Sequence, residues 1–274
     1  MNIVAYSYFR NRHSGYEREK GDAAKQFEQF LPMLVRAHRI VWSGWTMRLY
    51  HDDHIKTLPY YPSLMRLGMA GFIELRPFGQ SRSLCGVGGM LERMRPAWEP
   101  DVDYLLCRDV DSIPSPRERR AVDEFIASGK TVHVIHDAPK PHAGSHSGIM
   151  GGTLGIHVPR FRSLIGFSSL EAFIASGPEF NFDVQGADQH LLNKHYAKLA
   201  PHLLLHGLHR GFESEMPGCE VRRKIAGETS DDDACKDVLC RIIGGCDWPD
   251  KALAYYDTLK NDAIYRIQEC ELGV

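Results

Sequence analysis

The sequence has no long apolar run, and this absence excludes an integral membrane protein with helical spans. No stretch approaches the roughly 18 consecutive apolar residues that a membrane-spanning helix needs. The short apolar run 3–9 is followed at once by Arg10, Arg12 and His13, which is not the pattern of a signal peptide. We therefore expect a chain that begins with its first strand and carries no membrane span, stem or anchor.

Paired cysteines and an excess of positive charge are also missing. The seven cysteines are an odd, scattered set without a CxxC pair, which argues against a disulfide framework and against a cysteine zinc site. Reduced thiols suit the cytoplasm, where we expect the protein to reside. A net charge of -2 supplies no overall positive field, so any polyanion would have to be bound by a local basic cluster.

No GxGxxG loop follows the first predicted strand, which excludes a nicotinamide-dependent Rossmann enzyme. The apolar spacing alternates between strand and helix periods up to about residue 136, and this predicts an α/β fold with an open, mostly parallel sheet. The glycine-rich stretch 149–157 reads as extended. We expect strands at 3–9, 45–50, 73–76, 104–107, 132–136 and 203–205, and helices at 23–41, 90–98, 115–128, 159–175, 187–198 and from 249 onward.

Two carboxylates, Asp109 and Asp111, directly follow the buried-looking strand at 104–107. In open α/β sheets ligands gather at the carboxyl ends of the strands. Carboxylates two residues apart can face one ligand, and hard oxygens of this kind suit Mg²⁺ or Mn²⁺ completed by diphosphate oxygens and water. Such an ion would act as a Lewis acid toward a departing diphosphate. The alternative for a bare DxD is a polar turn that caps the helix predicted after Ser115.

The residues around this DxD resemble a known pattern. The run YLLCRDVDS at 104–112, then SPRE at 115–118 and SGK at 128–130, is similar to nucleotide-sugar glycosyltransferases from bacterial surface-polysaccharide clusters and from phages. The likeness continues in HDAP at 136–139, IMGGTLG at 149–155 and GADQHLL at 186–192. It implies a GT-A fold, Rossmann-like with helices flanking the sheet, over 1–210, and a small helical C-terminal extension over 211–274 packed on the same domain.

The resemblance also implies a metal site and a sugar site. Asp109 and Asp111 would bind Mn²⁺ or Mg²⁺. A third metal ligand would come from His206 or His209, and His206 is favoured because it directly follows the strand at 203–205. The pair Asp188 and Gln189 is similar to one beside the donor sugar in family 8 glycosyltransferases, so both are predicted as catalytic residues. The alternative for Asp188 is an ordinary acid at a helix N-terminus.

The donor-binding prediction rests on residues of several kinds. Gly151 and Gly152 have no side chains and would let a ligand approach the backbone, although a bulged core strand is the alternative. Guanidinium groups match phosphate geometry. The resemblance also implies that the end of the first strand holds the nucleotide base. The full predicted set of donor-binding residues is Tyr6, Ser7, Arg82, Arg108, Asp109, Asp137, Gly151 and Gly152.

Together these inferences predict a metal-dependent glycosyltransferase that moves a sugar from a UDP-sugar to a hydroxyl acceptor. A saccharide is the expected acceptor. The phage relatives suggest an alternative, a hydroxylated pyrimidine in DNA that receives a sugar such as glucose or arabinose. A second alternative is an inactive nucleotide-sugar binder on the same fold. A phosphatase of the haloacid-dehalogenase type is disfavoured, because its motif ends the first strand and needs Thr or Val where Ile113 stands.

Overall fold

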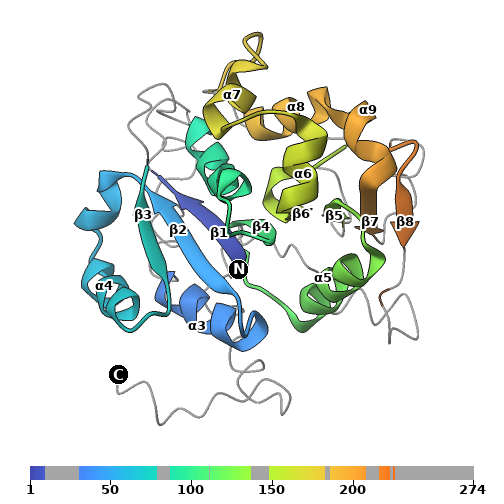
Figure 1. The fold of residues 1–274 in the computed structure, drawn as a ribbon. Coiled ribbons are helices and arrows are strands. Elements are labelled where there is room, and N and C mark those ends of the chain that lie inside the picture. Colours follow the sequence, from blue (N-terminus) through green and yellow to red (C-terminus); the bar gives the residue numbers. More distant parts are fainter. Residues whose placement is uncertain are drawn as a thin grey trace, which may run out of the picture.

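The computed structural model describes residues 1–9, 31–78, 87–110, 112–136, 148–182, 186–207, 216–222 and 225. Within these ranges the strands form one sheet in the order β3-β2-β1-β4-β6-β5-β7-β8 (Figure 1). The strand β6 runs antiparallel to β4 and β5, and all other neighbours are parallel. The strands are β1 (Asn2–Tyr8), β2 (Thr46–His51), β3 (Glu74–Pro77), β4 (Tyr104–Asp109), β5 (Val132–His136), β6 (Gly155–His157), β7 (Leu203–Gly207) and β8 (Glu220–Arg222).

The predicted α/β fold with a mostly parallel sheet flanked by helices is therefore confirmed. Helical segments cover both faces of the sheet (Figure 1). None of the described helices is long and apolar enough to cross a membrane. The α-helices are α3 (Leu31–Val41), α4 (Tyr61–Met69), α5 (Pro116–Ser128), α6 (Val158–Ile165), α7 (Leu170–Ala175), α8 (Ala187–Lys194) and α9 (Tyr196–Leu199), and the 3₁₀ helices are η1 (Asp53–Thr57), η3 (Val87–Trp98), η4 (Gly151–Thr153) and η5 (Ala200–His202).

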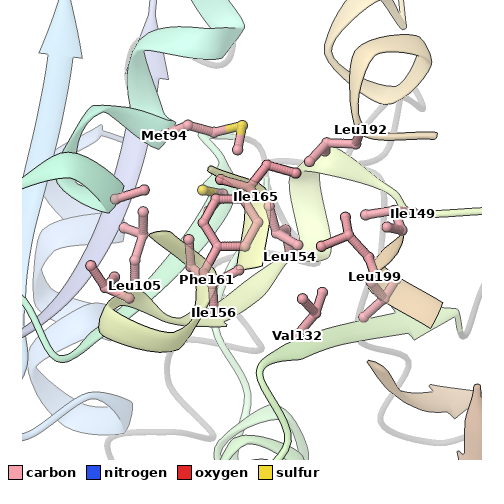
Figure 2. Packing of buried hydrophobic residues seen from close by; sticks show 14 of the residues in the cluster. Met94, Leu105, Val132, Ile149, Leu154, Ile156, Phe161, Ile165, Leu192 and Leu199 are labelled. Atoms are coloured by element: carbon pink, nitrogen blue, oxygen red, sulfur yellow. The ribbon is translucent and has the colours of Figure 1, made fainter. Parts of the chain in front are cut away.

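The sheet divides the apolar core in two. Strand β1 contributes to both parts, because successive side chains of a strand point to opposite faces. Ile3 and Ala5 pack with η3 and with helices α6 to α9. Val4 and Tyr6 pack on the other face with α3, α4 and α5. Figure 2 shows the first of these clusters, in which Phe161 of α6 lies among aliphatic residues from the sheet and from the helices.

The order of connections fixes where a ligand can bind. From β1 the chain continues to β2 and β3 on one side, and β4 lies on the other side. In such sheets the crevice outside the carboxyl ends, at the point where the winding reverses, is the usual ligand site. Here that point lies between β1 and β4, where Ser7 pairs in register with Asp109.

Local signals in the sequence explain the boundaries of α5. The Ser115 side chain accepts a hydrogen bond from the Glu118 backbone N–H, and Pro116 occupies the first helical turn. Gly129 then ends the helix in a left-handed conformation, with φ 68°. Both ends of this helix are as the sequence predicts.

Other segments differ from the sequence-based expectations. The helix expected at 90–98 is the 3₁₀ helix η3, which contains Pro96, and proline removes an α-helical hydrogen bond. The extended stretch expected at 149–157 contains the η4 turn before the short strand β6. Helix α4 and strand β8 were not expected. Residues 23–30 of the first predicted helix, and the helix predicted from 249 onward, lie outside the described residues, as does most of the extension at 211–274.

His38 of α3 is a buried histidine on the face of the sheet that α3, α4 and α5 cover. Its Nε2 lies 3.2 Å from the Trp45 carbonyl oxygen, so Nε2–H donates there, while Nδ1 is buried without a described partner. Burial lowers the pKa of His38 from 6.5 to about 4, although the bond to Trp45 opposes this shift. A proton on Nδ1 would be buried without an acceptor, so protonation of His38 is unfavourable in the folded protein.

We predict that acid weakens the fold through His38. As the pH falls through 6.5 the unfolded chain takes up a proton and the folded chain does not until about pH 4. This difference lowers the free energy of unfolding by up to about 3 kcal/mol over that window. His38→Gln, which can still donate to the carbonyl but cannot titrate, should show a shallower decline in urea denaturation. Parallel profiles for the two proteins would contradict the prediction.

Candidate active site

The candidate site is built around a buried guanidinium. Arg93 of η3 donates through Nη1 to Asp109 Oδ1 and through Nη2 to Asp188 Oδ2, the second bond being 2.7 Å long. The Arg93 and Asp188 side chains are each 4% exposed, whereas that of Asp109 is 39% exposed. One cation therefore joins a carboxylate at the end of β4 to a carboxylate at the start of α8.

Electrostatics explain why this arrangement can be buried. Burial would lower the pKa of Arg93, but the carboxylates of Asp109 and Asp188 raise it instead, so the guanidinium stays charged. Its planar fork suits carboxylate oxygens, and Nη1 also donates to the Arg108 carbonyl oxygen at 3.3 Å. The charges of Arg93 and Asp188 compensate one another where water is largely excluded, and the partly exposed Asp109 is the second partner of Arg93.

Two glycines of the η4 turn lie against these carboxylates. A Cβ atom on Gly151 would stand 2.0 Å from Asp188 Oδ2, and one on Gly152 would stand 2.1 Å from Asp109 Oδ2. Both distances are far below any real contact, so a larger residue at either position would displace the carboxylate that Arg93 holds there. The sequence predicted a close approach of a ligand to this backbone, and the structure has protein carboxylates there.

Several polar atoms on the segments that form the site lack a partner among the described residues. They are Ser7 Oγ, Gln189 Oε1 and Thr153 Oγ1. Ser7 pairs in register with Asp109, Gln189 follows Asp188, and Thr153 ends the η4 turn. Buried polar atoms normally have hydrogen-bond partners, so these three atoms near the carboxyl ends of the strands are available to a ligand.

The structure thus brings together six of the predicted residues that it describes: Ser7, Asp109, Gly151, Gly152, Asp188 and, next to Asp188 in α8, Gln189. Asp188 is the second residue of α8, which begins at Ala187 after Gly186 in a left-handed conformation with φ 84°. Its position at a helix N-terminus favours a negative charge. The DxD segment and the Asp-Gln segment therefore meet at the carboxyl end of β4.

Tyr6 and Arg108, predicted to bind the donor, lie elsewhere. Both alternate with site-facing neighbours along their strands and so point to the opposite face. Tyr6 is fully buried beside His38, and burial raises the pKa of its hydroxyl. Arg108 forms a buried ion pair with Glu118 of α5 and donates to the Leu154 carbonyl oxygen at 2.8 Å. Both side chains are buried on the opposite face and do not contact the Asp109 side chain.

His206, favoured as the third metal ligand, is not brought to Asp109. It lies on β7, three strand positions from β4, which is about 14 Å along the sheet. Its Nε2 donates to Glu124 Oε2 at 3.1 Å, and its Nδ1 accepts from His133 Nε2 at 2.8 Å. Burial lowers the pKa of both rings. With both ring nitrogens bonded, His206 belongs to a buried histidine–carboxylate chain.

Four other predicted residues, Asp111, Arg82, Asp137 and His209, lie outside the described residues. In the part of the chain that is described, no group of three or more His, Cys, Asp or Glu side chains could hold a metal ion. The Asp109 carboxylate is nevertheless suited to bind a metal ion. Its Oδ2 accepts no hydrogen bond from the described residues, its side chain is partly exposed, and a carboxylate oxygen is the ligand type that Mg²⁺ and Mn²⁺ prefer.

Arg93 is the residue that sequence reasoning missed. The stretch 90–98 predicted a helix, and a lone arginine there reads as a solvated residue. The signal that could have found it is the apolar surroundings: Leu91, Met94 and Ala97 are all buried, so an arginine between them needs buried acids as partners.

No protein-family model matches the sequence, and no curated protein does either. Among solved structures, the chain is similar to a glycosyltransferase involved in the glycosylation of the major capsid of PBCV-1, with 11% identity over 86% of this chain and 98% of the other, at a TM-score of 0.42. It is also similar to LgtC in complex with donor and acceptor sugar analogues, with 10% identity over 74% and 73% and a TM-score of 0.43.

A third similar structure is a TarS fragment from S. aureus, with 9% identity over 60% of this chain and a TM-score of 0.39. The chain spans 49% of the length of that fragment. Similarities at such low sequence identity bear on the fold alone. The function proposed below therefore rests on the residues of this protein.

We predict that Arg93 is the main stabilising element of the site. Arg93→Met leaves Asp188 buried without its cation and should lower the free energy of unfolding by about 3 kcal/mol. Adding Asp188→Asn should recover part of that loss, because the remaining side chain is neutral. Denaturation in urea measures both changes.

The control is Arg76→Met, which breaks an exposed pair with Glu74 and should cost less than about 1 kcal/mol. Equal losses for the Arg93 and Arg76 variants would show that the site carboxylates are solvated and need no guanidinium.

Proposed function

We propose that this protein is a glycosyltransferase that transfers a sugar from a UDP-sugar to a hydroxyl acceptor. The observation that carries the proposal is the Arg93 bridge, which fixes Asp109 and Asp188 at the carboxyl ends of the sheet. Asp109 comes from the DxD segment and Asp188 from the Asp-Gln segment, so two motifs far apart in the sequence form one site. The sequence resemblance assigns the first to the diphosphate and the second to the sugar.

We infer that a divalent cation, Mn²⁺ or Mg²⁺, binds to Asp109 and Asp111. Bound there, it would neutralise the charge that develops on the departing diphosphate. Asp109 Oδ2 lies against Gly152 and is the oxygen available for this purpose, since Oδ1 accepts from Arg93. His206 takes no part in this assignment, because Glu124 and His133 already engage its ring nitrogens.

The residues of the chain would then order the two reactants. Asp188 and Gln189 would hold sugar hydroxyls, with Gln189 Oε1 as an acceptor that has no partner among the described residues. Ser7 Oγ would bind the donor at the end of β1. The acceptor oxygen bonds to the anomeric carbon, and its proton is released to water. The bond from that carbon to the diphosphate oxygen breaks, and its electron pair leaves with UDP.

A saccharide is the acceptor that we propose, because it is the acceptor expected from the resemblance to enzymes of bacterial surface-polysaccharide clusters. The experiment is a panel of nucleotide sugars assayed for diphosphate release with Mn²⁺. The best donor is then offered to oligosaccharides and to DNA with hydroxylated pyrimidines. Transfer to DNA alone would replace the saccharide assignment, and metal-dependent UDP binding without turnover of any donor would indicate an inactive binder.

We predict that Asp109→Asn lowers metal-dependent UDP release by about 100-fold or more, because the neutral amide is a poor ligand for a hard cation. The variant should keep its fold, since Asp109 is partly exposed. Steady-state rates with and without Mn²⁺ measure the effect.

Asp123→Asn is the matched control. This substitution makes the same change of charge on the exposed side of α5, where Asp123 pairs with Arg119. Its rate should equal that of the wild type. Retained activity in Asp109→Asn would sink the assignment of the metal to this carboxylate.

A further inference from the structure

The segment 148–153 is held against polar side chains at three glycines. Besides the contacts of Gly151 with Asp188 and of Gly152 with Asp109, a Cβ on Gly148 would stand 2.0 Å from Asn193 Oδ1. Gly148 also has φ 115°, a backbone conformation that other residues rarely adopt. Two of these contacts involve the site carboxylates, and the third involves an asparagine for which the proposed reaction gives no role.

Asn193 grips the backbone of this segment with both ends of its amide. Its Oδ1 accepts from the Ile149 N–H at 2.8 Å, and its Nδ2 donates to the Ile149 carbonyl oxygen at 3.3 Å. The same Nδ2 donates to the Gln189 carbonyl oxygen at 2.8 Å, one turn earlier in α8. The Ile149 side chain is buried in the core (Figure 2). Asn193 therefore fastens the segment to the helix that carries Asp188 and Gln189.

A second bond holds the start of the segment to the sheet. His136, at the end of β5, donates from Nε2 to the Gly148 carbonyl oxygen at 2.8 Å. Burial lowers the pKa of His136 to about 4, so its ring is neutral near pH 7 and this hydrogen bond does not depend on a charge. The segment is thus fixed to β5 on one side and to α8 on the other.

We propose that Asn193 is a positioning residue that sets the distance between the sugar side and the diphosphate side of the site. This inference rests on the proposed function. The Asn193 grip fixes Ile149, and two residues later Gly151 meets Asp188, and then Gly152 meets Asp109. If the grip is lost, α8 can move relative to β4 and only Arg93 still links the two carboxylates. Misplacement by about 1 Å costs roughly 100-fold in turnover.

The position of Asn193 predicts an effect on the sugar and not on the nucleotide. Asn193 acts on the η4 turn and on α8, whereas UDP would be held at β1 and at Asp109. Loss of the grip should leave the Kd for UDP within about 2-fold, weaken UDP-sugar binding about 10-fold and lower kcat by up to about 100-fold. A residue that only stabilises the fold would change the affinities for UDP and for the UDP-sugar equally.

The experiment compares three variants in the presence of Mn²⁺, with UDP and the best UDP-sugar titrated by calorimetry and turnover measured separately. Asn193→Ala removes all three hydrogen bonds. Asn193→Asp keeps an acceptor for the Ile149 N–H but has no donor, so its losses should be intermediate. Gly148→Ala leaves Asn193 unchanged but forces a Cβ into its Oδ1, and should act in the same direction.

The control is Lys194→Ala, the next residue of α8, whose exposed pair with Glu179 lies outside the grip. It should match the wild type in both affinities and in kcat. If Asn193→Ala does not fold, Asn193→Asp and Gly148→Ala carry the comparison.

Each outcome bears on a different proposal. A wild-type protein that turns over no donor overturns the proposed function and this inference with it. A wild-type protein that transfers sugar, with Asn193 variants that keep their kcat or lose UDP and UDP-sugar affinity alike, overturns the positioning role alone. Hydrogen exchange of the free protein gives a check without substrate: exchange of the Ile149 amide should be faster in Asn193→Ala than in Lys194→Ala.

Discussion

The bridge from Arg93 to Asp109 and Asp188 is the constraint on which the rest of the site depends. A guanidinium that is 4% exposed needs compensation by carboxylates, and here these come from the end of β4 and the start of α8, 79 residues apart along the printed sequence. Because the bridge closes only when η3, β4 and α8 are all in place, the site geometry is tied to the folding of the whole sheet. The buried neighbours of Arg93 on η3 serve the same end, since Leu91 and Met94 hold that segment on the core.

The glycines of the η4 turn follow from the bridge. Once Asp109 and Asp188 are drawn to one cation, the backbone that passes beside them has no room for a Cβ atom. This accounts for the turn within a stretch that the sequence presents as extended. It also explains why the antiparallel strand β6 starts only at Gly155, after the backbone has cleared the carboxylates. Asn193 and His136 then fix the entry to the turn, so side chains from α8 and β5 determine its course.

Periodicity and capping predicted most of the sheet and the ends of α5, because those features depend on residues close together in the chain. The placement of Asp109 and Asp188 followed from the rule that ligands collect at strand ends, together with the family resemblance. Tyr6 and Arg108 were misplaced for a simple reason: a strand end identifies residues but the pleat decides which face each one takes, and both fall on the face of α3 and α5. His206 was misplaced because the antiparallel β6 separates β5 and β7 from β4, and chain order does not reveal an inserted strand. Arg93 was missed because its partners are distant in sequence.

The charges of the site bear on the order in which ligands can bind. Asp109 and Asp188 share one guanidinium, which leaves one formal negative charge, and Asp111 would add a second in the proposed metal site. A UDP-sugar diphosphate is itself anionic and would be repelled from such a site by like charge. In the proposed site a divalent cation would offset this negative charge, and its open coordination positions would take the diphosphate oxygens. Arg93 cannot take over this role, because both arms of its fork are already bonded to carboxylates and it is buried behind them. In the proposed reaction, donor affinity would therefore depend on the metal even before any bond is broken, while Arg93 holds Asp109 and Asp188 in place.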